Sequence, residues 1–328
     1  MELEIVKQLT SANLLSPIQE QRIADHHKNK LFSLHWELRT ILFVGISLFT
    51  SGIGILVYNN IDTIGHQTII GLIALMCGGC FLYCFKHGLP YSNNRVERPS
   101  PFFDYVLLLG CLLFVTLETY LQFQYTVFGD LYNLASLLPA AHFIFLAYKF
   151  DNKGILSMAI TAVASTIGLT VTPLDLIDGN DFSSDSLIYT SIVFAILMCI
   201  CARLLYNKDI KKHFTFTYYN FATNIAFVAT LAGLFDTDYR LVFFILLLLF
   251  AFAGYRYAKL EKSPYFLLIS IIYAYIGLSY FSFYILDQIS YSFWDNGGFF
   301  LVMLYFGGTC FGIIQLFRKY RKILNITE

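Results

Sequence analysis

The stretch GILVYNNIDTIGHQTIIGLIALMCGG, residues 54–79, decides the fold class, because it begins and ends as apolar chain and is polar in its centre. The central residues 59–67 read NNIDTIGHQ and include no Lys or Arg. Backbone inside a bilayer has to satisfy its own hydrogen bonds, so a polar run of this length is expected at a membrane surface. We therefore predict two membrane-spanning helices joined by an outer turn at residues 59–67. A loop that contacts a ligand is the alternative for these residues.

The composition supports a membrane protein. Of the 328 residues, 57% are hydrophobic and only 13% are charged, whereas about a quarter of the residues in a soluble domain are charged. All seven cysteines lie inside hydrophobic runs, which argues against the disulfide framework of a secreted protein. The first 30 residues lack the short apolar core of a signal peptide, so we expect the first span to act as an uncleaved signal anchor.

The number of spans follows from the apolar runs, since a helix needs about 20 apolar residues to cross a bilayer. Ten stretches qualify, and together they predict an all-α polytopic bundle of about ten transmembrane helices. The stretch 154–171 is the weakest candidate, because it is short and rich in Ser, Thr and Ala. The ten stretches are 40–58, 68–85, 102–122, 129–149, 154–171, 185–206, 214–235, 239–257, 264–286 and 298–317.

The charges between the spans predict the orientation, because Lys and Arg accumulate in cytoplasmic loops. When the segments are assigned alternately to the two sides, 21 of the 22 basic residues fall on one side, and Arg240 is the exception. This alternation predicts that both termini are cytoplasmic. In a bacterial host the membrane would be the inner one, since outer-membrane proteins are usually β-barrels.

Two parts of the chain are distinguished by their polarity. Residues 1–38 predict a short cytoplasmic helical lead, and residues 39–328 predict the ten-span transmembrane domain. Within the lead, Ser16, Pro17 and Gln19 have the spacing of a helix start with a capping box. We expect the lead to serve as a lid or packing element, with docking of a partner as the alternative.

The N-terminal quarter has a Leu…Ser-x-x-Gln motif in the polar lead, an Asn-x-Asp turn and two Gly-rich spans around that turn. The residues are Leu14, Leu15, Ser16, Pro17, Ile18, Gln19, Glu20 and Gln21, then Gly45, Gly52 and Gly54, then Asn60, Ile61 and Asp62, and finally Gly71, Gly78 and Gly79. In these features the chain resembles DUF2157, a family of predicted membrane proteins. The resemblance implies a membrane protein and supplies no chemistry.

Ionisable groups inside membrane segments are candidates for function, because burying them is costly. Glu118 lies near the outer end of the third predicted span, and Asp130 opens the fourth on the same side. With Arg240 and two further aspartates they would form an outer acidic vestibule with one basic partner. The alternative is that these are solvated charges at the membrane interface.

Three residues lie deeper in the predicted spans. His142 is either a neutral histidine bonded to a neighbouring helix or a proton relay. Asn220 and Asn224 are one turn apart, and they either hydrogen-bond across helices or line a polar path.

The cysteines of the second predicted span offer a further pattern. Cys77, Cys80 and Cys84 share one helix face, which is the start of a metal site, but no fourth ligand is evident nearby, and helix packing is the expected role. We predict no cofactor and no metal.

Two functions from different classes remain. The first is a structural, accessory or partner-binding membrane protein, which would contact the lipid bilayer and either a membrane-protein partner or a second copy of itself. The second is a secondary transporter of a small solute, built from two five-span halves. We do not expect an enzyme, since the sequence contains no Walker A, HExxH or GxSxG motif. The basic residues are accounted for by orientation, so no nucleic-acid partner is expected.

Overall fold

The computed structural model describes residues 35–97, 99–100, 102–129, 131–171, 184–289 and 298–323. Residues 1–34 of the predicted lead, which was expected over residues 1–38, lie outside this description, as do residues 172–183. The chain forms two compact units, residues 1–60 and 61–328, and the division falls in the last turns of the first described helix.

The described residues are all-helical. Each of the ten predicted stretches coincides with one α-helix, and one short 3-10 helix precedes α10. The elements are α3 (His35–Ile64), α4 (His66–His87), α5 (Phe103–Tyr125), α6 (Tyr132–Phe150), α7 (Lys153–Val171), α9 (Asp185–Asn207), η1 (Lys212–Phe214), α10 (Thr215–Asp236), α11 (Arg240–Leu260), α12 (Pro264–Ile289) and α13 (Gly298–Ile323).

The first predicted turn is shorter than expected. Helix α3 continues through residues 59–64, and only Gly65 separates it from α4. Gly65 has φ 81°, a backbone conformation that glycine adopts without the steric cost paid by other residues. The polar run NNIDTIGHQ is therefore mostly the end of one helix and the start of the next, since polar side chains are compatible with helical backbone near a membrane surface.

Five helices are long and apolar enough to cross a bilayer, namely α4, α5, α9, α11 and α12. Shorter apolar segments lie in α3, α7 and α13, at Thr40–Leu56, Lys153–Gly168 and Gly298–Thr309. Helices α6 and α10 carry Asn, Ser, Thr and Tyr among their apolar residues. The structure therefore supports an integral membrane protein with at least five candidate spans.

The exposed surface of these helices is apolar. In the five candidate spans, between 17% and 33% of the residues are buried against the rest of the protein. Large side chains such as Leu75, Leu82 and Leu260 are more than 70% exposed. Monomeric soluble proteins rarely expose apolar surface so extensively, so lipid is the expected neighbour of these faces.

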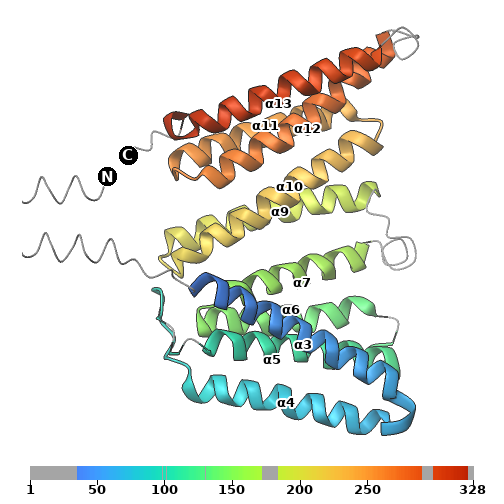
Figure 1. Ribbon diagram of the computed structural model, residues 1–328, viewed down its shortest axis with the longest axis vertical. Helices are drawn as coiled ribbons and strands as arrows, with labels where there is room; N and C mark the ends of the chain where they lie inside the picture. Colours follow the sequence, from blue (N-terminus) through green and yellow to red (C-terminus); the bar gives the residue numbers. More distant parts are fainter. Residues whose placement is uncertain are drawn as a thin grey trace, which may run out of the picture. The chain divides into compact units, whose positions relative to one another are not determined.

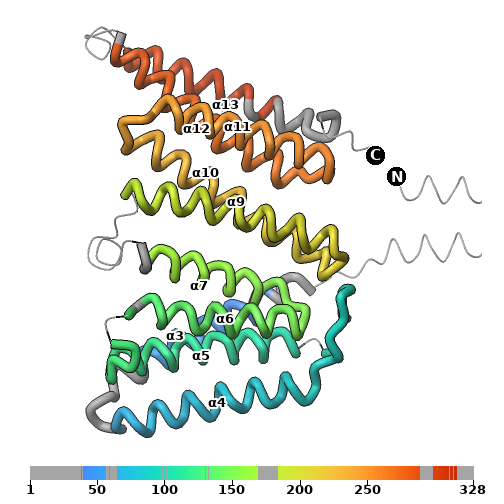
Figure 2. The backbone as a smooth tube through the Cα atoms, turned by 180° about the vertical axis from the view of Figure 1, so that it is seen from behind, coloured from blue at the N-terminus to red at the C-terminus, as the bar shows by residue number. Residues whose placement is uncertain are grey.

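Within residues 61–328, consecutive helices run in opposite directions, as Figures 1 and 2 show from two sides. The closest pairs are α4 with α5, α6 with α7, α9 with α10, and α11 with α12. Helix α10 joins them, because it contacts α7, α9, α11 and α12. One buried apolar cluster draws on α4 to α7, α9 and α10, and a second lies among α9 to α12.

Gly233 permits the close approach of α10 and α11. A Cβ atom at this position would lie 2.4 Å from the ring of Phe243, and Phe243 is only 3% exposed. We expect Gly233→Ala to lower the free energy of unfolding by about 1–3 kcal/mol, the usual cost of overpacking a core. Reversible unfolding in mixed micelles, followed by circular dichroism, measures this loss.

Gly71→Ala in α4 is the matched control, because nothing lies within 4 Å of a Cβ atom built there. We expect this variant to unfold like the wild type. Equal stabilities for the two variants would contradict a packing role for Gly233.

Candidate functional site

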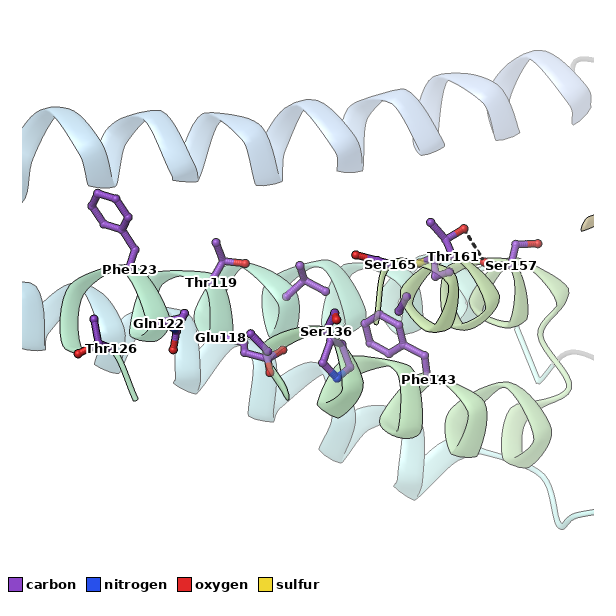
Figure 3. A pocket seen from close by; sticks show the side chains of 15 residues that line it. Glu118, Thr119, Gln122, Phe123, Thr126, Ser136, Phe143, Ser157, Thr161 and Ser165 are labelled. Atoms are coloured by element: carbon purple, nitrogen blue, oxygen red, sulfur yellow. Dashed lines mark hydrogen bonds between the residues drawn. The ribbon is translucent and has the colours of Figure 1, made fainter. Parts of the chain in front are cut away.

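A cavity of 960 Å³ lies among α5, α6 and α7. Figure 3 shows the lining side chains on these three helices. The lining combines apolar side chains with hydroxyl groups, one amide and one carboxyl group. It consists of Val115, Glu118, Thr119, Gln122, Phe123, Thr126, Ala135, Ser136, Pro139, Phe143, Ser157, Met158, Thr161, Ala162 and Ser165.

Glu118 is the one ionisable group in this lining. The residue is 7% exposed, and its Oε1 atom has no hydrogen-bond partner among the described residues. Burial of an unpaired polar group costs free energy, and burial of an unpaired charge costs much more. Other atoms of Glu118 line the cavity, and a donor or a cation that reached the buried Oε1 atom from the cavity would supply the partner it lacks.

The α7 wall of the cavity is a line of hydroxyl groups. Ser157, Thr161 and Ser165 follow one another at intervals of one helical turn. The hydroxyls of Ser157 and Thr161 donate to the backbone carbonyls of Lys153 and Ser157, both at 3.0 Å, the second bond being drawn in Figure 3. Because each hydroxyl oxygen keeps its lone pairs after donating, this wall offers acceptors to a bound molecule.

Two features in α6 and α5 shape the remaining walls. Pro139 lies inside α6, and because proline has no N–H it gives the carbonyl oxygen of Ala135 no helical hydrogen bond. At the end of α5, the Gln122 side chain donates to Gly129 O at 2.8 Å and accepts from Phe128 N at 2.9 Å. Gln122 thereby holds the α5–α6 turn at one end of the cavity.

Among the predicted site residues, Glu118 lines this cavity and His142 does not. The ring of His142 stacks on Phe114 with the centroids 4.7 Å apart and meets Phe81 edge-on at 5.1 Å. The buried Nε2 atom has no partner in the described part of the chain. Phe114 is one turn before Glu118 on α5, so the ring of His142 contacts the same helix as the cavity without lining it.

Asn220 and Asn224 take part in the contact between α10 and α12, away from this cavity. Asn224 Nδ2 donates to Asn220 Oδ1 at 2.9 Å, and Tyr265 of α12 donates to the same Asn220 oxygen. Tyr273 of α12 donates to Asn224 Oδ1 at 3.3 Å. The two amides are thus used in hydrogen bonds between α10 and α12.

The predicted outer vestibule is only partly described. Asp130 lies outside the described residues. Arg240 starts α11, and its guanidinium carbon lies 4.6 Å from the ring centroid of Tyr284 in α12. Arg240 does not line the cavity that contains Glu118, so these two residues occupy different sites.

The cysteines of α4 pack against α5. Cys77 and Cys84 are buried, and Cys77 Sγ lies 3.5 Å from the carbonyl oxygen of Gly110. A Cβ atom on Gly110 would meet Cys80 Cβ at 3.1 Å. Among the residues with described side chains, no three His, Cys, Asp or Glu residues are grouped to hold a metal ion.

A second polar site, which the sequence analysis did not predict, joins three interhelical turns. We call Asp151, Lys211 and His213 the turn cluster. The side chains of Asp151 and Lys211 are 2% and 0% exposed, and Lys211 Nζ lies 3.3 Å from Asp151 Oδ1. His213 Nε2 contacts the same oxygen. The cluster links the α6–α7 turn to the α9–α10 turn.

The third turn, between α4 and α5, supplies backbone partners. Val96 N donates to Asp151 Oδ2 at 2.6 Å, Lys211 N donates to Asn93 O at 2.8 Å, and Lys211 Nζ lies 3.5 Å from Asn94 O. Asp151 has φ 56° and Lys211 has φ 44°, and these left-handed conformations direct both residues into the cluster. The sequence signal for the turn cluster is an aspartate, Asp151, in a turn that otherwise carries the basic residues Lys149 and Lys153.

Because of the turn cluster, we expect the stability of the folded protein to depend on pH. Burial lowers the pKa of His213 below its ordinary value of 6.5 and outweighs the opposing pull of Asp151, while Lys153 and Lys211 lower the pKa further. Between the folded-state pKa and 6.5 the unfolded chain therefore binds more protons, so stability rises with pH in that window. We expect the wild type to lose stability as the pH falls below about 6.5, measured by unfolding in mixed micelles.

The His213→Gln variant should lack this part of the pH profile, because Gln retains a hydrogen-bond donor for Asp151 but does not titrate. His87 on α4, which is exposed, provides the matched control, and His87→Gln should retain the wild-type profile. An unchanged profile in His213→Gln would contradict the assignment.

The fold and the cavity define the class of protein: a multi-pass helical membrane protein with a mostly apolar cavity, which contains a few polar groups, among three of its helices. Residues 7–156 match the model of a family described as predicted membrane protein (DUF2157). The resemblance expected from the N-terminal quarter is thereby confirmed and extended through α6. The match includes the α5 and α6 walls of the cavity and ends at the beginning of α7. Neither the curated proteins nor the solved structures contain a significant match.

Proposed function

We propose that this protein binds a small solute in the cavity among α5, α6 and α7 and carries it across the membrane as a secondary transporter. The observation that supports this function is the Glu118 carboxyl group, nine-tenths buried in the cavity lining with Oε1 unpaired among the described residues. Ionisable groups within membrane segments mark substrate and ion pathways. The role is non-enzymatic and needs no covalent chemistry.

The cavity agrees with this function in size and construction. Small-molecule sites are commonly 300–1,000 Å³ and are mostly apolar with a few placed polar groups, and this cavity has 960 Å³. Transporter sites also tend to use interrupted helices, and Pro139 interrupts the bonding of α6 in the cavity wall. An accessory subunit that acts by contact with a partner would have no need of these features.

The proposal includes ten spans with both termini in the cytoplasm, and the inner membrane in a bacterial host. In support, the turn cluster brings together the α4–α5, α6–α7 and α9–α10 turns. These are three of the turns that carry the basic residues. Because basic turns stay cytoplasmic, this end of residues 61–328 faces the cytoplasm in the proposed orientation.

Thiol accessibility tests whether the cavity receives water-soluble molecules. In a variant without the seven native cysteines, a cysteine at Thr161 should react rapidly with methanethiosulfonate ethylammonium. A cysteine at Ile196, a residue of α9 that is 46% exposed, should react slowly, because lipid excludes the reagent. Both positions lie near the middle of their helices, so depth in the membrane is matched.

Equal, slow reaction at the two positions would contradict a solute-accessible cavity. A stoichiometric membrane-protein partner that copurifies and shields Thr161→Cys would instead support the accessory function. Size-exclusion profiles of each variant establish that the comparison is made on folded protein.

A further inference from the structure

We propose that the cavity takes an organic cation, and that this cation and a proton compete for the Glu118 carboxylate. The inference rests on the proposed solute-binding function and adds the chemical class of the solute. It also identifies the proton as the ion whose movement is coupled to that of the solute.

The charge of the cavity has one sign. Glu118 is acidic, and the other lining residues are neutral, with no Lys, Arg or His among them. A buried carboxylate without a partner is costly, and a cation bound beside it removes that cost. An anionic solute would meet the same carboxylate without any compensating positive charge.

The neighbouring titratable groups do not supply a counter-charge. On α4, His66 Nδ1 lies within hydrogen-bond distance of Tyr120 OH, at 2.6 Å. The cysteines of α4 cannot carry a positive charge. On α6, His142 lies between Phe81 and Phe114. The α7 wall contributes hydroxyl groups, Met158 and Ala162. Among the described residues, none of these elements provides a basic group hydrogen-bonded to Glu118.

The rest of the cavity suits a cation with an apolar body. Val115, Phe123, Phe143 and Met158 contribute apolar surface, and aromatic faces attract cationic groups. The α7 hydroxyl oxygens provide acceptors for any N–H groups that the cation carries. A small, strongly hydrated metal cation would need several oxygen ligands at short distance, whereas an organic cation needs one counter-charge and an apolar wall.

The exchange is balanced in charge and atoms. In the empty state a proton occupies the carboxyl group as –COOH. When the cation enters, the O–H bond breaks, its electron pair stays on the oxygen, and the proton leaves to water. The product is a carboxylate paired with the cation. One carboxylate neutralises one positive charge, so the proton and the organic cation cannot both be bound to it. This mutual exclusion is required if transport of the cation is to be coupled to movement of the proton.

Two probes of the same shape test the inference. One is (1-naphthylmethyl)trimethylammonium, whose charge is permanent, and the other is neutral 1-naphthylmethanol. Binding to the purified wild type is measured by calorimetry in two buffers of different ionisation heat, which counts the protons released. We expect release that approaches one proton per bound cation at low pH, and an affinity for the cation that rises up to about tenfold per pH unit.

Glu118→Gln is expected to weaken cation binding by about 30-fold or more, since it removes the partner of a desolvated charge. It should also abolish proton release and leave the affinity for naphthylmethanol within about threefold of wild type. Glu118→Asp, which retains the carboxyl group, should retain proton release. Naphthylmethanol binding also shows that the Gln variant is folded.

The outcomes separate the two proposals. If both probes bind with equal affinity and without proton release, the cavity is a solute site but the cation–proton exchange is wrong. If neither probe binds the wild type, while Thr161→Cys is also unreactive, the solute-binding function itself is overturned. Cation binding that survives in Glu118→Gln would assign the cation to a different site and overturn the inference.

Discussion

The Asp151→Asn variant is expected to unfold with a free energy about 3–5 kcal/mol below that of the wild type, because it leaves the buried Lys211 ammonium without a counter-charge. Both side chains are at least 98% buried, and Nζ lies 3.3 Å from the carboxylate. Breaking such a pair by removing one partner is far more costly than breaking a solvated one. The three turns held by this cluster are expected to separate at lower denaturant.

Asn is the appropriate replacement, because it removes the charge and keeps the size of the side chain. Position 151 has φ 56°, and Asn tolerates this left-handed region better than most residues. Asp151 accepts from Val96 N through Oδ2 and from His213 through Oδ1, whereas Asn has a single side-chain oxygen and can keep only one of these hydrogen bonds. The loss in unfolding free energy therefore combines the unpaired ammonium with one lost acceptor, and removal of the ammonium in a double variant separates the two.

Reversible unfolding in mixed micelles, followed by circular dichroism, measures this effect. The control is Asp209→Asn, which removes the partner of Lys212 in the same α9–α10 turn. That pair is solvent-exposed, so no measurable loss is expected. The double variant Asp151→Asn, Lys211→Met should recover most of the stability, because it leaves no buried charge. A double variant as unstable as the single one would contradict the argument.

The second large effect has the opposite sign. Glu118→Leu is expected to raise the free energy of unfolding by about 1–3 kcal/mol, the cost of an unsatisfied buried polar group that the substitution removes. Leu is similar in length and can pack against the apolar side chains of the cavity. The same variant should lose the cation binding proposed for Glu118. Stability given up at a binding site is a common feature of functional residues.

Gln122→Leu is the matched control for Glu118→Leu, because both residues line the same cavity. The Gln122 amide makes two hydrogen bonds to the α5–α6 turn, so its replacement should lower the unfolding free energy, by about 1–3 kcal/mol. The two variants are compared by unfolding in mixed micelles. A loss of stability in Glu118→Leu would indicate that the carboxyl group has a stabilising partner.

Much of the fold could be predicted from the sequence, and the cavity much less. The ten apolar stretches correspond to ten helices, with Gly65 and not residues 59–67 as the first break. Glu118 was identified from its place in an apolar run. The sequence also contains the hydroxyl groups of the α7 wall, although their composition alone does not indicate a cavity. The Ser and Thr residues that made 154–171 the weakest predicted span include the hydroxyl groups of the cavity.

The sequence by itself determined the helices and the pattern of basic turns, because hydrophobic length and loop charge are local properties of the chain. Only the tertiary structure decided which polar groups find partners. Asn220 and Asn224 meet tyrosines 41 to 49 residues away, and His213 meets Asp151 across 62 residues. Glu118 remains unpaired among the described residues. Pairing depends on which helix faces meet, and the short-range pattern of hydrophobicity does not encode that choice.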